Sequence, residues 1–269
     1  MSGPHLFDAG VALEPAGDVL RGRTRPEWKN FIGPFGGLIA AQAMNAVLLH
    51  RQRLGDPVSL TVNFAAAIED GEFDAIATPA RTNRSTQHWI VTLQQKGEVV
   101  ATATALTAIR RDTWGAKEAP VPQVPRPSDV PLPEGPTRVE WVKRYELRFI
   151  EGGFPGAWDG GDTGASRTRL WVRDNPPRPL DWLSLTAMSD VFFPRIWLRR
   201  ATFTPLGTIT MTTHFHATQA QLAETGTGYL LGQTQGQGFG AGYFDHSAQL
   251  WNEAGTLLAT TSQVYYFKE

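Results

Sequence analysis

GEVVATATA (residues 97–105) and GTLLATTSQ (residues 255–263) are nearly the same strand written twice in one chain. Their last residues, Ala105 and Gln263, lie 158 residues apart. That spacing is far longer than the roughly 20–50-residue period of solenoid repeats. The repetition therefore predicts two folding units of similar plan. It also raises a question, because only the second copy ends in a large amide.

Each copy closes a similar series of elements. Apolar segments with the length and composition of buried helices occupy residues 36–50 and 179–194. Strand-like runs follow each segment, and the last two runs of each half are joined by tight turns at residues 96–97 and 254–255. One buried helix followed by an antiparallel meander, twice, predicts an α+β fold of two antiparallel sheets, each wrapped around a central helix.

The alignment of the two halves is specific. His88 falls on His246 at the same offset of 158 residues. Asn63-Phe64 matches His214-Phe215 at an offset of 151, so the loop that follows differs by seven residues between the halves.

A proline-rich segment separates the two series. Residues 117–137 read KEAPVPQVPRPSDVPLPEGPT, and proline at this density continues neither a helix nor a central strand. The sequence therefore predicts a first unit at residues 1–112, a linker at residues 113–137 and a second unit at residues 138–269.

Composition narrows the classes of function. The chain has 269 residues, a net charge of −1 and no cysteine. A near-neutral net charge shows no excess of basic residues that would favour nucleic-acid binding. The absence of cysteine excludes disulfides, thiolate zinc sites and a cysteine nucleophile. No signal peptide or membrane-spanning run is apparent, so we expect a soluble cytoplasmic protein that binds neither nucleic acid nor membranes.

The order of these elements resembles the double hotdog fold of the bacterial acyl-CoA thioesterase II family. The features that carry the resemblance run through the whole chain: FGGLIAAQAM and RTNRSTQHW in the first half, MSDVFFP, TITMTTHFH and LLATTSQ in the second. The resemblance implies a cofactor-free hydrolase of fatty acid metabolism that acts on acyl-CoA and forms a homo-oligomer. It also implies an Asp-Thr-Gln group that orients a water, which falls on Asp190, Thr208 and Gln263.

The residues support part of this assignment by themselves. Asp190 is the only acid in an apolar and hydroxylic stretch, where an unpaired carboxylate is costly to bury. Strand alternation places Leu257, Ala259, Thr261 and Gln263 on one face, matching Val99, Ala101, Ala103 and Ala105 in the first copy. A large amide on a helix-facing surface needs hydrogen-bond partners. Thr208 alone carries little information, because threonine is common in strands.

A thioester needs only an ordered water, a base and oxyanion donors for hydrolysis. We expect Asp190 to be the base, with Gln263 and Thr208 holding the water and the carboxylate. We expect Gly36 and Gly37 to bind substrate, together with Arg84 and Ser85 in the RTNRSTQ loop. The residues of that loop fit a solvated loop without a binding role equally well.

Three alternatives stay open at this point. A hotdog hydratase or dehydratase would pair His214 or His246 with Asp190. A non-catalytic protein would bind acyl-CoA without releasing CoA. His214 and His216 share a strand face, but no third ligand is evident, so we expect no metal.

Overall fold

The computed structural model describes residues 3–135, 137 and 139–269, so Pro136 of the linker and the predicted unit boundaries at Met1 and Arg138 lie outside the described residues. The strands are β1 (Glu14–Ala16), β2 (Val19–Arg23), β3 (Asp56–Phe64), β4 (Glu72–Thr82), β5 (Thr86–Gln95), β6 (Glu98–Ala108), β7 (Tyr145–Glu151), β8 (Thr168–Asp174), β9 (Leu206–Phe215), β10 (Leu230–Gln235), β11 (Phe239–Gly240), β12 (Tyr243–Asn252) and β13 (Leu257–Phe267). The α-helices are α1 (Leu6–Val11), α2 (Gly36–Leu48), α3 (Trp182–Met188), α4 (Ile196–Arg199) and α5 (Gln219–Thr225), and 3-10 turns lie at Pro26–Trp28, Pro127–Asp129 and Glu140–Arg144.

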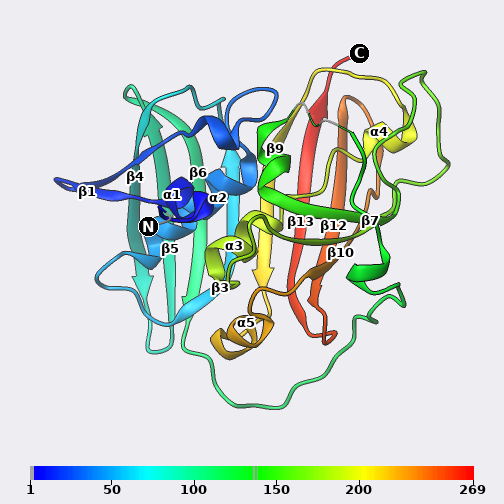
Figure 1. Cartoon of the computed structure of the whole chain (residues 1–269). Helices are drawn as coiled ribbons and strands as arrows, with labels where there is room; N and C mark the ends of the chain where they lie inside the picture. The colour runs from blue at the N-terminus through cyan, green and yellow to red at the C-terminus, as the bar shows by residue number, and fades with distance from the viewer. Residues whose placement is uncertain (1–2, 136, 138) are drawn as a thin grey trace.

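The strands form one antiparallel sheet, not the two sheets that the sequence predicts. Its order is β1-β2-β4-β5-β6-β3-β9-β13-β12-β10-β8-β7, with β11 beside β12 (Figure 1). The two halves have the same strand order and meet where β3 pairs with β9, from Ser59 opposite His214 to Asn63 opposite Thr210. Backbone pairing joins the two predicted sheets because each half ends its sheet in an open edge strand.

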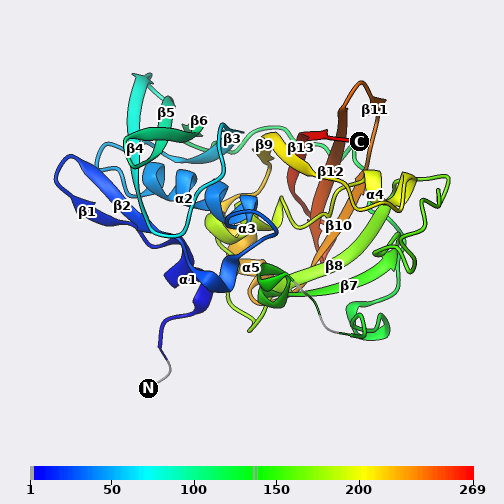
Figure 2. The same ribbon diagram turned by 90° about the horizontal axis from the view of Figure 1, so that it is seen from above.

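Helices α2 and α3 lie together on the concave side of the curved sheet (Figure 2). Helix α2 begins at Gly36 and ends at Leu48, close to the predicted range of residues 36–50. Its two polar side chains, Gln42 and Asn45, donate to the carbonyl oxygens of Gly10 and Val11 at 2.8 Å each. The amides that look anomalous in an apolar helix therefore satisfy the last carbonyls of α1.

The second central helix is shorter than predicted. Helix α3 spans seven residues, begins after the Asp181 N-cap and ends at Met188, whereas the sequence predicts a helix over residues 179–194. Beyond Met188 the hydrogen bonds connect residues three apart instead of four, and the N–H of Asp190 donates to the carbonyl of Ala187 at 3.1 Å. Asp190 thus lies in a turn, because polar residues such as Ser189 and Asp190 favour helix ends over interiors and Pro194, which has no N–H to donate, cannot continue α3.

The last hairpins of the two halves differ by one residue, and this changes which face two side chains occupy. In the first half Trp89 pairs with Ala105, whereas in the second His246 pairs with Gln263. The true counterpart of His246 is therefore Trp89, because a one-residue slip moves side chains to the opposite face. The predicted match with His88 is wrong: His88 is exposed.

The shared face of each last strand is also one residue shorter than predicted. Both hairpins contain a register shift near the turn. Val99 is therefore 41% exposed, and Leu257 packs against the cluster of Val130, Trp171 and neighbouring residues on the convex side of the sheet. From Ala101 and Ala259 onward the predicted alternation is confirmed.

The proline-rich segment packs against the second half. Val130 is buried beside Trp171 and Tyr229 on the convex side of the sheet. The Trp171 indole donates to the Pro125 carbonyl at 2.9 Å, and the Arg148 guanidinium donates to the Val130 carbonyl at 2.6 Å. The segment is therefore a strap held to β7 and β8 by its own carbonyl groups.

Two further elements complete the repeat. Each half contains a hairpin before its helix, β1–β2 or β7–β8, and each hairpin lies at an outer edge of the sheet. The loop that is seven residues longer in the second half contains α5, itself seven residues long and started by a capping box of Thr218 and Gln221. Within the described residues, no helix is long and apolar enough to span a membrane.

Candidate active site

Asp190 lies at the junction of the two halves, in the turn after α3. Only 9% of its surface is exposed. Burial raises the pKa of its carboxyl group to about 7, although hydrogen bonds from Gln263 and from the Gly37 N–H act in the opposite direction. A carboxyl group with a pKa near neutrality exchanges protons readily at physiological pH, as a general base must.

Gln263 reaches Asp190 from strand β13. Its amide nitrogen Nε2 lies 2.8 Å from Oδ1 of Asp190 and 3.5 Å from the Ser189 carbonyl oxygen. Its amide oxygen accepts a hydrogen bond of 2.6 Å from the Tyr265 hydroxyl. Because a hydroxyl donor holds the oxygen end, the nitrogen end of the amide is the one directed at the carboxylate. The structure therefore brings two of the predicted catalytic residues into direct contact.

The N-terminus of α2, in the first half, closes the site from the other side. A side chain at Gly36 would place its Cβ 2.8 Å from Oδ2 of Asp190, and one at Gly37 would lie 2.5 Å from the Ala187 carbonyl. Only glycine permits this approach. The Gly37 N–H donates to Asp190, and the positive end of the helix dipole favours the ionised carboxylate.

Thr208 faces the same side of the sheet as Gln263 because of a bulge. Gln263 pairs with Met211, but two residues later Tyr265 pairs with Thr208, so β9 contains one extra residue between these pairs. Paired residues lie on the same face, and a bulge redirects side chains in this way. The Thr208 side chain therefore hydrogen-bonds to Tyr265, whose hydroxyl in turn donates to Gln263.

Tyr265 is a site residue that the sequence did not predict. Tyr265 is buried, and burial raises the pKa of its hydroxyl well above the usual value, with the Asp190 charge as a further cause. The neutral hydroxyl is therefore the donor that fixes the Gln263 amide. The signal was present in the sequence, because Tyr265 follows Gln263 by two residues and strand alternation places both on one face.

His246 and Arg195 extend the polar surroundings of Gln263. His246 is 1% exposed, lies opposite Gln263 on β12, and has its ring centroid 5.4 Å from that of Tyr265. Burial, and then the charge of Arg195, hold the pKa of His246 well below its usual value. Burial also lowers the pKa of Arg195 to about 9. The sequence indicated His246 only as a partner of Asp190 in the hydratase alternative, and it did not indicate Arg195.

Other predicted residues lie elsewhere. Arg84 and Ser85 are in the loop between β4 and β5, near Ala108, which pairs with the Asp56 end of β3. The Gly36 side of the site is next to Phe64, at the opposite end of β3. The structure thus does not bring Arg84 and Ser85 to Asp190, and their role in substrate binding stays a prediction.

The two histidines weighed as metal ligands are both exposed. His216 contacts Thr260 at 3.0 Å through Nε2. Across the described part of the chain, no group of three or more acidic, histidine or cysteine side chains is arranged to hold a metal ion. The absence of a metal requirement stays a prediction.

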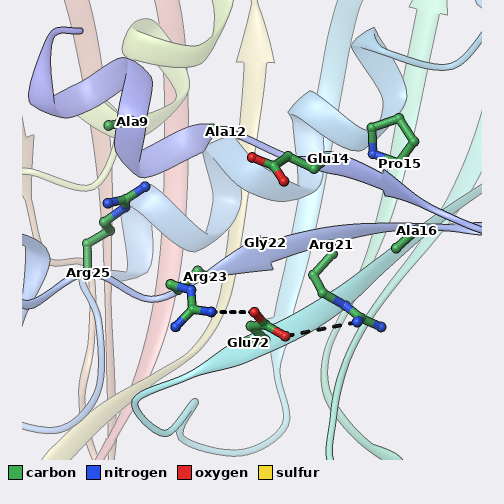
Figure 3. Close-up of a pocket in the computed structure, with 10 residues that line it drawn as sticks. All are labelled: Ala9, Ala12, Glu14, Pro15, Ala16, Arg21, Gly22, Arg23, Arg25 and Glu72. Atoms are coloured by element: carbon green, nitrogen blue, oxygen red, sulfur yellow. Dashed lines mark hydrogen bonds and ion pairs between the residues drawn. The ribbon is translucent and has the colours of Figure 1, made fainter. Parts of the chain in front are cut away.

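Two hollows lie away from Asp190. One, of about 240 Å³, is lined by α1, β1, β2 and β4 in the first half (Figure 3). There Glu72 forms solvent-exposed ion pairs with Arg21 and Arg23. The other, of about 960 Å³, lies between the proline-rich strap and the convex face of the second half. Neither contains a predicted site residue.

Comparisons with known proteins agree with this architecture. The family model for the acyl-CoA thioesterase C-terminal domain matches residues 119–267, and that for the N-terminal domain matches residues 24–108. A crystal structure from Alicyclobacillus acidocaldarius, described as a conserved protein of unknown function with a hot dog fold, is 42% identical over 99% of both chains with a TM-score of 0.93. No curated protein matches the sequence.

Two more distant structures share the fold. The acyl-CoA thioesterase II TesB2 of Mycobacterium marinum is 19% identical, with coverage of 97% of this chain and 98% of its own and a TM-score of 0.75. A tesB protein of Mycobacterium avium subspecies paratuberculosis is also 19% identical, with coverage of 99% and 100% and a TM-score of 0.78.

Proposed function

The chain belongs to the acyl-CoA thioesterase family, and we propose that it hydrolyses acyl-CoA to a free acid and CoA at the site around Asp190. The observation that carries the proposal is the contact of 2.8 Å between Gln263 Nε2 and Asp190 Oδ1, beside the N-terminus of α2. A fixed amide, a buried carboxyl group of raised pKa and a helix N-terminus suit an attacking water and a developing oxyanion.

Each residue has a distinct role in the proposed reaction. The ionised Asp190 removes a proton from a water, whose oxygen attacks the thioester carbonyl carbon. The C–S bond then breaks, and the sulfur takes the proton from Asp190 as CoA leaves. Gln263 orients the carboxylate and the water, and Thr208 supports this group through Tyr265. The Gly36 N–H, at the N-terminus of α2, binds the carbonyl oxygen of the substrate, whereas the Gly37 N–H holds Asp190.

The domain organisation is also proposed here. We interpret the single sheet as a double hotdog, in which residues 1–112 and 138–269 are the two units and residues 113–137 connect them. Arg84 and Ser85, which lie far from Asp190, are candidates for contacts with the CoA part of the substrate. A cytoplasmic location and a homo-oligomeric state stay predictions from the sequence.

An assay of thiol release tests the function. Purified protein is offered a panel of saturated acyl-CoA thioesters while free thiol is measured, and turnover with at least one of them is expected. Binding without thiol release would favour the non-catalytic alternative.

One observation keeps a second reaction in view. His246 lies on the same face of the sheet as Gln263, and a histidine near an acid is what a hydratase uses. Hydration of an enoyl-CoA, with no hydrolysis of its saturated counterpart, would favour that alternative.

A further inference from the structure

A buried arginine lies near the candidate site without an acidic partner. The Arg195 side chain is fully buried at the start of α4. Its guanidinium donates to the carbonyl oxygens of Phe193 and Ser166 and to the Thr168 hydroxyl, all of which are neutral. Among the described residues, no Asp or Glu forms an ion pair with Arg195. A buried charge without a counter-ion is unfavourable, so an anionic ligand would compensate it.

A second buried polar side chain near the site, that of His246, has open hydrogen-bonding capacity. Within the described part of the chain, neither ring nitrogen of His246 has a hydrogen-bond partner, although the side chain is almost fully buried. Burial holds the pKa of His246 well below its usual value, and the charge of Arg195 acts in the same direction, so the ring is neutral. Phe192, three residues before Arg195, lies edge-on to the ring with 6.1 Å between centroids. A neutral imidazole offers one N–H donor. Because buried polar groups in native proteins almost always have partners, His246 indicates a place for a ligand atom.

In the first half, the position that corresponds to His246 has its hydrogen bonds satisfied. Trp89 occupies the position of His246, and its indole donates to the Thr107 hydroxyl at 3.1 Å. Both of these residues are buried with their polar atoms satisfied. The fold does not itself require an unsatisfied polar side chain at this position, and the unpartnered nitrogens of His246 are therefore specific to the second half.

We propose that Arg195 and His246 form a subsite for a carboxylate at the far end of the acyl group, so that the substrate is the CoA thioester of a short dicarboxylic acid. This rests on the proposed function. His246 is the direct cross-strand neighbour of Gln263, and such side chains are about 5 Å apart at Cβ. A short acyl chain therefore brings its far end beside His246 when its thioester carbonyl lies next to Gln263. Water adds to the carbonyl carbon, the C–S bond breaks, and the products are the free dicarboxylic acid and CoA.

Matched substrates test the proposal. In 4-methylpentanoyl-CoA an isopropyl group replaces the carboxylate of succinyl-CoA with nearly the same shape. We expect kcat/KM for succinyl-CoA to exceed that for the neutral isostere by at least about 30-fold. Equal values, or a preference for the isostere, would overturn the subsite while leaving the proposed function intact.

A binding measurement separates the two proposals. Succinate and 4-methylpentanoate are titrated into the protein by calorimetry, with no reaction required. If neither thioester is hydrolysed, the proposed function fails, and tighter binding of succinate would still support the subsite. Weaker or equal binding of succinate would contradict it.

Variants then locate the subsite. Arg195→Met and His246→Leu should each lower the ratio of succinyl-CoA to isostere kcat/KM by about 10-fold or more, and Arg195→Lys should restore part of it. Arg21→Met, at an exposed ion pair with Asp74, is the control and should leave the ratio unchanged. If Arg195→Met does not fold, His246→Leu decides the result, and an unchanged ratio in a folded variant would contradict the proposal.

Discussion

The two halves of the chain build the same sheet around different interiors. In the first half Ala105, Trp89 and Thr107 fill the space beside the helix, and the Trp89 indole donates to the Thr107 hydroxyl. In the second half Gln263, His246 and Tyr265 occupy the corresponding positions. The residue two positions past the helix is His50 in the first half, packed edge-on against Trp89, and Asp190 in the second. The same backbone therefore supports a filled core in one half and a polar site in the other.

The largest test of this comparison is removal of the carboxylate. Asp190→Asn keeps the shape of the side chain but removes the base, so kcat should fall by about 10²–10⁴-fold. His50→Asn changes the corresponding position of the first half and should leave kcat within about twofold of wild type. Thiol release under saturating substrate measures both. Near wild-type turnover by the Asp190→Asn variant would show that the site lies elsewhere.

The pH dependence of activity sharpens the assignment of the base. The pKa of Asp190 is raised to about 7, and the carboxylate is the active form. The value of kcat/KM should therefore fall about tenfold per pH unit below pH 7 and level off above it. A flat profile between pH 5 and pH 8 would contradict Asp190 as the base.

The stability of the folded protein should fall as the pH rises, whereas its activity should increase. The unfolded chain ionises Asp190 near its ordinary pKa of 3.8, whereas the folded protein holds the proton up to about pH 7. Between these values the folded state binds more protons, so its stability falls as pH rises. The melting temperature of Asp190→Asn relative to wild type should consequently increase from pH 4 to pH 8.

Exchanging residues between the halves tests whether the amide belongs to the site alone. Gln263→Ala should lower kcat by about 10- to 100-fold, because Asp190 loses its orienting partner. The reverse change, Ala105→Gln, buries an amide against Trp89 and should destabilise the protein by roughly 1–3 kcal/mol without any gain in activity. Steady-state kinetics and thermal unfolding report the two effects. If Asp190 and Gln263 act as a unit, the double variant should lose much less than the product of the single losses.

The smallest effect is expected from the hydroxyl that holds the amide. Tyr265→Phe keeps the stacking against Phe244, at 4.7 Å between ring centroids, but removes the donor to Gln263 Oε1. Turnover should fall by about three- to tenfold, because the amide can then rotate away from Asp190. The loss should vanish in the Gln263→Ala background, and a full additional loss there would contradict a role through Gln263.

The fold was largely predictable because its pattern is repeated. Helix α2 and the strands β3–β6 follow from apolar segments bounded by turn residues, and the strands recur in the same order 151–158 residues later. The junction of the sheets was not predictable, because β3 and β9 read like any half-buried strand and nothing in their residues specifies a neighbour. The face of His246 was missed because one extra residue in a hairpin reverses the alternation.

The site was predictable where a residue breaks a local pattern. Asp190 and Gln263 were conspicuous as polar groups in apolar surroundings. Arg195 was not, because an arginine after a proline is ordinarily exposed, and its burial depends on contacts with Ser166 and Thr168 that lie 27–29 residues away. The contribution of Gly36 and Gly37 to the surroundings of Asp190 likewise depends on how the two halves meet.

The pairing of β3 with β9 bears on how either half would behave alone. Five residue pairs join the halves there, and the Thr61 and Thr212 hydroxyls add a hydrogen bond of 2.9 Å across the join. Cutting the chain would leave each half with a long unpaired strand edge, whose free N–H and C=O groups readily recruit another strand. The remaining outer strands of the intact chain, β1 and β7, have only three and seven residues. Linking the halves thus hides the two edges most prone to self-association, and a separated half should aggregate or pair with its own copy.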